Sequence, residues 1–198
     1  MDLYDSQEVV KQRKTRSTTF RLDTKVVDEL QKEADQEEIS LNVLVNQILR
    51  RYIEWDRFES KLNLLPIPKL MLTRMIDETL EVAKDAKIQD LESYRNKIAK
   101  NAAEVALNIM KDSVLFMKKE YNLWTVLDVL RNYMKVAGIT SDHTLEAGRK
   151  HVFVIQHDLG QNWSLFAKEL LILIFADLAH VRADISETSK TIKAEINL

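Results

Sequence analysis

The spacing of hydrophobic and polar residues changes from a period of two to helical spacing within the first fifty residues. Residues 17–22 alternate between polar and largely apolar side chains, which predicts a short strand with two unlike faces. Asp23 follows as a candidate helix N-cap, and apolar residues then recur at helical spacing as far as Ala34. Ser40 is a second candidate N-cap, and residues 41–53 carry the i, i+3, i+4, i+7 pattern of an amphipathic helix. The pattern predicts a strand followed by two helices.

Helical spacing continues through most of the remaining chain. Both prolines fall within residues 62–68, where they prevent a continuous helix and predict a short extended linker. Asn122 is the expected cap of one later helix, and Gly138 is its expected end. The apolar spacing predicts helices within three stretches, residues 72–83, 91–109 and 123–137.

Residues 150–157 are the best strand candidate of this second part, because they are rich in β-branched and aromatic side chains. The residues just before them alternate only weakly and are a candidate hairpin partner. We expect a turn over residues 157–164 and then a buried helix over 165–185, since that stretch is apolar nearly all round. One helical stripe is expected in the core, formed by Trp124, Leu127, Leu130 and Met134.

These patterns divide the chain into four parts. We expect a basic flexible arm over residues 1–15, a strand and two helices over 16–61, a proline-containing linker over 62–68, and a C-terminal domain over 69–198. The expected fold class is mostly α. The C-terminal domain is expected to be mainly helical α+β, with a short strand or hairpin near residues 144–157.

Composition excludes several classes of protein. The chain has 198 residues, of which 45% are hydrophobic and 30% charged, as in a folded globular protein. The absence of cysteine excludes disulfides and favours a reducing, cytoplasmic location, and the acidic N-terminus does not resemble an export signal. No glycine-rich phosphate loop, GxSxG or HExxH motif occurs, so we do not expect an enzyme.

Basic residues cluster just before and within the expected strand, although the formal net charge of the chain is only -2. No acidic residue interrupts residues 11–21, and several of these cations are able to neutralise DNA phosphates. A solvated tail is the alternative interpretation. The cluster consists of Lys11, Arg13, Lys14, Arg16 and Arg21.

A strand, two helices and a brief turn make a unit too small to close a core alone, so such a unit is expected to dimerise. The order and spacing of STTFRL, DTKVVDELQKEAD, EEIS and LNVLVNQILRRYIEWD over residues 16–57 resemble the ribbon-helix-helix DNA-binding family, the Arc and MetJ type of repressors. The turn between the helices reads QEEIS here, whereas the family often has a glycine. The resemblance implies that the strands of two chains pair into an antiparallel ribbon that enters the major groove.

The resemblance also implies roles for particular residues. Ser17, Thr19 and Arg21 match the ribbon positions that face the groove and contact bases, and a guanidinium can bind guanine in a bidentate manner. For Arg21, pairing with a phosphate or a carboxylate is the alternative. Ser40 and Asn42 match the start of the second helix, where backbone amides hold a DNA phosphate. For Ser40, capping alone is the alternative.

The basic arm completes the set of expected phosphate contacts. Lys11, Arg13, Lys14 and Arg16 would lie along the DNA backbone or the neighbouring minor groove and would become ordered on binding.

The histidines of the second part, with Asp142 and Asp158 nearby, are the residues that suggest metal chemistry. Imidazole is a common metal ligand, but His151 and His157 would lie roughly 20 Å apart along one strand and would need a bend or a second chain to share a metal. We therefore expect no metal site and no cofactor. His143 and His180 are the remaining histidines. The region around Trp163 is expected either to close a small apolar pocket or to fill the core.

Together these patterns predict a cytoplasmic, sequence-specific DNA-binding transcriptional regulator, a repressor, that acts as a homodimer. Its partners are double-stranded DNA and further copies of the chain, and no membrane is involved. The C-terminal domain would serve oligomerisation or signal input from a small-molecule or protein effector. An antitoxin-type protein, whose C-terminal part binds a protein partner, is the main alternative, and a helical assembly protein that does not bind DNA is another.

Overall fold

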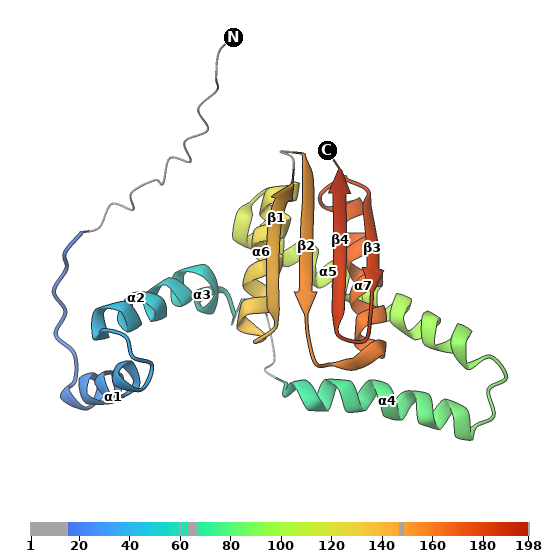
Figure 1. Cartoon of the computed structure of the whole chain (residues 1–198), viewed down its shortest axis with the longest axis horizontal. Coiled ribbons are helices and arrows are strands. Elements are labelled where there is room, and N and C mark those ends of the chain that lie inside the picture. The colour runs from blue at the N-terminus through green and yellow to red at the C-terminus, as the bar shows by residue number, and fades with distance from the viewer. Residues whose placement is uncertain (1–15, 60, 63–66, 147–148, 198) are drawn as a thin grey trace, which may run out of the picture. The chain divides into compact units, whose positions relative to one another are not determined.

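The structure is a computed structural model that describes residues 16–59, 61–62, 67–146 and 149–197. The described residues form two compact units, and the boundary between them in the chain falls between Leu49 and Arg50. The protein is mostly helical, with a small antiparallel sheet in the second unit (Figure 1). The predicted four-part division of the chain stays a prediction.

Two helices make up the regular structure of the first unit: α1 (Thr24–Gln36) and α2 (Leu41–Arg51), the latter running on past the boundary. The Asp23 carboxylate accepts a hydrogen bond from the Lys25 amide at 2.8 Å. The Ser40 hydroxyl accepts one from the Val43 amide at 3.3 Å. Both predicted N-caps are therefore confirmed. Residues 16–23 have no regular secondary structure in the single chain, so the strand expected over 17–22 stays a prediction.

The turn between α1 and α2 is closed without glycine. Glu38 adopts the left-handed conformation with φ 55°, where glycine is usual after a helix. The Ile39 amide donates to the Ala34 carbonyl at 2.9 Å, and the Glu38 amide donates to the Asp35 carbonyl at 3.3 Å. These bonds satisfy carbonyls at the end of α1 at the expense of strain in Glu38.

The second unit contains both helices and strands. It begins with a π-helical turn, η1 (Tyr52–Asp56), in which Trp55 is buried and meets Tyr133 edge to face at 5.4 Å. The helices that follow are α3 (Arg57–Glu59), α4 (Lys69–Asp85), α5 (Leu91–Lys118), α6 (Leu123–Val136) and α7 (Gly160–Asp177). The strands are β1 (Thr140–Glu146), β2 (Lys150–Gln156), β3 (Ala183–Glu187) and β4 (Thr191–Asn197).

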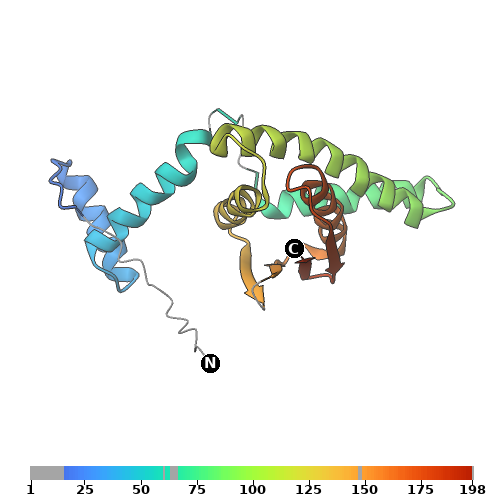
Figure 2. The same cartoon turned by 90° about the horizontal axis from the view of Figure 1, so that it is seen from above.

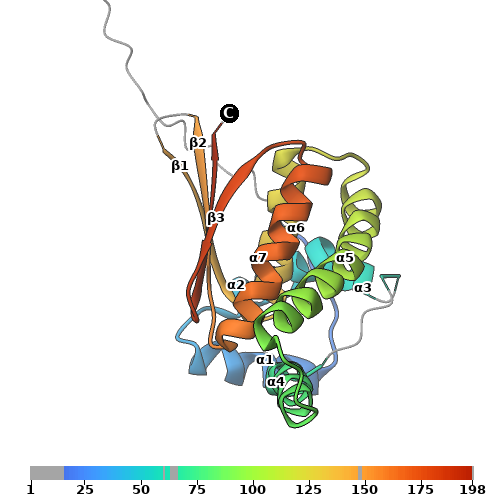
Figure 3. The ribbon, with the colours of Figure 1, turned by 90° about the vertical axis from the view of Figure 1, so that its right-hand side faces the viewer.

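The sheet is antiparallel throughout, with the strand order β1-β2-β4-β3 (Figure 1). Its helices α5, α6 and α7 all lie on one side of it, as Figure 3 shows. Side chains on that side, such as Phe153 and Ile192, are fully buried. On the opposite side Glu195 accepts hydrogen bonds from Lys150 and Lys193, which lower the pKa of this carboxyl to about 2. The alternation of apolar and charged residues is that of a sheet with one open face.

α7 lies at the centre of the second unit. It packs against α5 on one side and against β3 and β4 on the other (Figure 3). Ile174 and Phe175 are fully buried there, and Leu171 is nearly so. The longer α5 continues beyond this contact and forms a helical hairpin with α4 (Figure 2).

Several helix predictions for the second unit are confirmed. α4 and α5 cover the predicted stretches, and α6 begins after Asn122 with a capping box between Asn122 and Thr125. Gly138 has the left-handed φ of 62° expected just after a helix. The strand candidate and its partner form the β1-β2 hairpin, so the prediction of a hairpin near residues 144–157 is confirmed.

Three local predictions were wrong. The helix expected over residues 165–185 begins earlier, inside the expected turn, and ends at Asp177, because His180 turns the chain in a left-handed conformation with φ 53°. Residues 183–187 are instead β3, a strand that depends on pairing with β4. Trp124 is 60% exposed and lies outside the core, whereas the other members of the predicted stripe are buried.

The turn residue Glu38 provides a test of the first unit. The left-handed conformation costs about 1–2 kcal/mol in an L-residue, and Glu38→Gly removes this cost. Glycine also gives the unfolded chain more conformational entropy, which offsets about 0.4–1 kcal/mol of that gain. The substitution should therefore stabilise the turn by about 0.5–1 kcal/mol. Hydrogen exchange of the Ile39 amide should slow by about two- to fivefold.

Glu37→Gly is the matched control, because it removes the same charge from a neighbouring residue with an ordinary helical φ of -82°. It should weaken the turn by about 0.5–1 kcal/mol. Equal effects of the two substitutions on exchange would contradict the account of Glu38.

Candidate nucleic-acid interface and sites of the second unit

The residues expected to contact bases lie on an exposed segment of the first unit. Ser17, Thr19 and Arg21 are exposed, and the single chain does not join them in a strand. Arg16 is exposed on the same segment. The other expected arm contacts, Lys11, Arg13 and Lys14, lie outside the described residues.

The N-terminus of α2 has the geometry of an anion site. The Ser40 hydroxyl occupies the cap, and Asn42 lies exposed in the first turn, where its carbonyl oxygen accepts from the Asn46 side chain at 2.8 Å. No acidic residue stands in the first turn of α2 to offset its positive dipole end, and Arg50 and Arg51 lie in its last turn. The cap therefore has a confirmed structural role, and a phosphate contact at this end is compatible with it.

The first unit buries few of its apolar side chains. Among residues 16–49 only Ala34 and Leu44 are buried. Phe20 is 61% exposed, and Leu22 is 53% exposed. The helices add further exposed apolar side chains, namely Val26, Val43, Ile48 and Leu49. An exposed apolar set of this size in so small a unit is a candidate surface for binding a partner.

Two histidines of the second unit form a hydrogen-bonded pair that sequence spacing did not predict. His143 on β1 and the buried His151 on β2 have ring planes within 5° of each other, and their Nε2 and Nδ1 atoms lie 2.9 Å apart. Because these nitrogens face each other, the rings meet edge to edge and share one proton. Trp124 approaches the His151 ring edge to face at 4.9 Å. Burial is the main cause that lowers the pKa of His143, and the charges of the neighbouring His151 and Arg131 lower it further.

A third histidine holds the start of α7. The Leu159 amide donates to Nδ1 of His157 at 3.1 Å, so Nε2 carries the proton of the neutral ring and lies 3.0 Å from the Ser164 hydroxyl. Ser164 donates onward to the Gly160 carbonyl at 3.1 Å. Burial lowers the pKa of His157. A protonated ring would lose the bond from Leu159, so this corner of the fold requires the neutral form.

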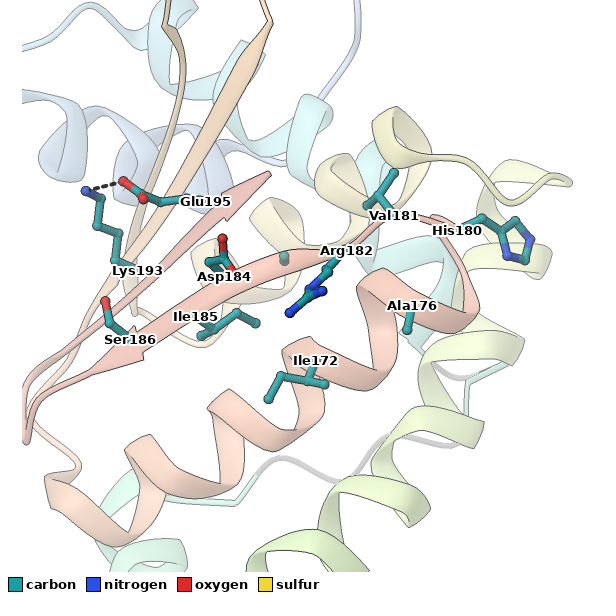
Figure 4. Close-up of a pocket in the computed structure, with 11 residues that line it drawn as sticks. Ile172, Ala176, His180, Val181, Arg182, Asp184, Ile185, Ser186, Lys193 and Glu195 are labelled. Atoms are coloured by element: carbon teal, nitrogen blue, oxygen red, sulfur yellow. Dashed lines mark ion pairs between the residues drawn. The ribbon is translucent and has the colours of Figure 1, made fainter. Parts of the chain in front are cut away.

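A broad hollow of about 860 Å³ runs between the outer edge of β3 and α7 (Figure 4). Ile172 and Ala176 line it from α7, and Asp184 and Ser186 line it from β3. Lys193 and Glu195 also line it and form an ion pair on the open face of the sheet, and Figure 4 shows the polar side chains pointing to different sides. The hollow is open to solvent, and no polar groups converge within it.

Two features that other functions would need are absent from the described part of the chain. No three histidine, aspartate or glutamate side chains gather there at metal-binding distance. None of its helices has the length and apolar character needed to span a membrane.

No protein-family model matches the chain, and no curated protein sequence matches it closely enough to indicate a family. The resemblance of residues 16–57 to the ribbon-helix-helix family therefore depends on the residues alone.

The buried histidines predict how stability changes with pH. Since the pKa values of His143 and His157 are lower in the folded than in the unfolded chain, the unfolded chain binds more protons below pH about 6.5. Stability should be fully present above that pH and should fall as the pH drops through the lowered folded pKa values. His157→Gln should reduce this loss, because glutamine does not titrate and can accept the Leu159 amide.

Urea midpoints at pH 7.5 and pH 5.5 measure the loss, and the quantity compared is the difference between the two midpoints for each variant. His180→Asn, at an exposed histidine, is the control and should change this difference little. A wild-type difference that persists in His157→Gln would show that this histidine does not carry the effect.

Proposed function

We propose that the protein is a sequence-specific DNA-binding transcriptional regulator, a repressor, that acts as a homodimer through an antiparallel β-ribbon. Residues 17–22 of two chains would form the ribbon, and α1 and α2 of both chains would form the shared core. The observation that carries this proposal is the uncovered apolar surface of the first unit, directly beside a segment without strand partners.

Dimer formation would remove this surface from water. Phe20 and Leu22 alternate with polar residues, so pairing of the segment as a strand would direct both toward the helices of the dimer. Fully burying one such side chain is worth about 1.5–3 kcal/mol. Pairing would also give alternate residues of the segment 17–22 backbone hydrogen bonds to the partner strand.

The same pairing would point Ser17, Thr19 and Arg21 into the major groove. Arg21 would read guanine through its two parallel donors, and the hydroxyls would contact neighbouring base edges. Ser40 and Asn42 at the start of α2, with Lys11, Arg13, Lys14 and Arg16, would hold phosphates and set the register without reading sequence.

The second unit would serve oligomerisation or signal input. It has a hydrophobic core of its own, built from α5, α6, α7 and the sheet. A part that folds only on a protein partner, as in many antitoxin-type proteins, would not need such a core. This observation favours a regulator with a folded C-terminal domain over the antitoxin alternative.

The test is selection of bound duplexes from a random pool by the full-length protein. We expect an inverted or tandem repeat to be enriched by the wild type. Arg21→Ala should lower the discrimination between the selected and a random duplex by about 1–3 kcal/mol.

Arg16→Ala is the matched control, because it makes the same substitution at an expected phosphate contact five residues away. It should weaken both duplexes about equally and reduce the salt dependence of binding by about one counterion. Equal losses on both duplexes for Arg21→Ala would reject base reading, and failure of the wild type to bind any duplex would reject the proposed function.

A further inference from the structure

A cavity of about 390 Å³ lies between α4, α5 and α7, near the N-terminal end of α7. Its volume lies within the range typical of small-molecule sites. Its walls are almost entirely apolar, and they come from the α4–α5 hairpin and from α7, which is far from that hairpin in sequence. The main lining residues are Leu72 and Ile76 of α4, Ile98 and Ala102 of α5, and Trp163 and Phe166 of α7. The sequence predicts either core filling or closure of an apolar pocket for the region around Trp163. Trp163 is buried and also lines this cavity, so it has both roles.

One charged side chain stands among the described residues that line this cavity. Arg95, near the start of α5, has a buried Nε that makes no hydrogen bond. Its Nη2 donates to the exposed carboxylate of Glu92 at 2.9 Å. The polar side chain of Asn162 also lines the cavity, but its amide already donates to Asp77 at 2.9 Å.

A buried guanidinium N–H without an acceptor is costly in free energy and needs an explanation. Among the described residues the only other buried side-chain nitrogen or oxygen without a partner is Nε1 of Trp55, which lies elsewhere in the unit. Nε and Nη2 of arginine lie on one edge of the guanidinium, and this edge matches the two oxygens of a carboxylate. The cavity therefore has an apolar body and one lining cation, Arg95, whose Nε has no acceptor.

We propose that this cavity binds an apolar organic acid, with its hydrocarbon body between α4, α5 and α7 and its carboxylate on the Nε and Nη2 edge of Arg95. The inference deepens the signal-input part of the proposed function by naming the chemical class of the effector. A neutral hydrocarbon would fill the same space but would leave Nε without an acceptor. Charge complementarity thus selects an acid over a neutral ligand.

Glu92 has a defined place in this site. Its carboxylate holds Nη2 of Arg95 in the free protein and would compete with the carboxylate of the ligand for that edge. Glu92 does not line the cavity, and its side chain is 70% exposed. Removing its charge should therefore strengthen the binding of an acid without changing the apolar walls.

The experiment is calorimetric titration of the full-length protein with octanoate and with octanamide, which has the same shape without the charge. Octanoate should bind about tenfold more tightly than octanamide, since a charged acceptor strengthens the hydrogen bonds. Arg95→Gln should abolish the difference while leaving octanamide binding in place. Glu92→Gln should tighten octanoate binding and leave octanamide unchanged.

Two further variants separate the site from general effects. Lys97→Gln removes an exposed cation from the same helix and should change neither affinity. Ala102→Phe fills the cavity and should abolish binding of both compounds, while circular dichroism and thermal melting report whether the variant remains folded.

The proposal is overturned if octanoate shows no saturable binding, if octanoate and octanamide bind equally, or if Arg95→Gln leaves their difference unchanged. Loss of a dimer in Ala102→Phe, measured by light scattering, would instead assign the cavity to a second copy of the chain and would also overturn the proposal. The titration contains no DNA, so its result is independent of the duplex selection, and either proposal can fail alone.

Discussion

Burial of α7 on two sides is the interaction on which the second unit depends. The helix is apolar nearly all round, and both of its faces are buried because it lies between α5 and the strands β3 and β4 (Figure 3). Fully buried side chains such as Phe175 leave little freedom to shift, because a packed interior has few voids. The positions of α5, of the sheet and of the cavity walls are therefore linked through one helix.

The first unit is built under the opposite constraint. Its two helices are well capped, but only Ala34 and Leu44 are buried among residues 16–49. Hydrogen bonds at helix ends specify local structure and cannot replace an apolar core as the source of stability. In the proposed dimer a second copy would give this unit both a core and a paired ribbon. Dimerisation and DNA recognition would then be one physical event.

α7 also places the proposed ligand site beside His157, whose neutral ring holds the start of this helix. Trp163, in its first turn, lines the cavity and lies 4.5 Å from the His157 ring, measured between ring centroids. His157 in turn receives the amide of Leu159, just before the helix begins. Occupation of the cavity and protonation of His157 therefore act on the same turn of α7. A change in that turn can reach the sheet through the buried face of the helix.

The sequence by itself determined the local elements. The predicted N-caps accept backbone hydrogen bonds through their side chains, at Asp23, Ser40 and Asn122. Gly138 comes just after a helix and has a left-handed φ. Short-range hydrogen bonds and apolar spacing are enough for such features, since both partners lie within a few residues. The strand β2 was also predicted, because its residues are rich in β-branched and aromatic side chains, and β1 was a candidate partner with only weak alternation.

Tertiary structure alone decided what depends on distant pairing. The helix expected over residues 165–185 included the start of this segment, but residues 183–187 form β3 because β4 provides hydrogen bonds. His143 and His151 are eight residues apart and meet through the register of a hairpin. Arg95, which periodicity places on an ordinary helix, becomes a candidate ligand-binding residue through contact with a cavity built from three helices. Periodicity shows that a residue lies on a face, and only the packing of other elements determines what that face meets.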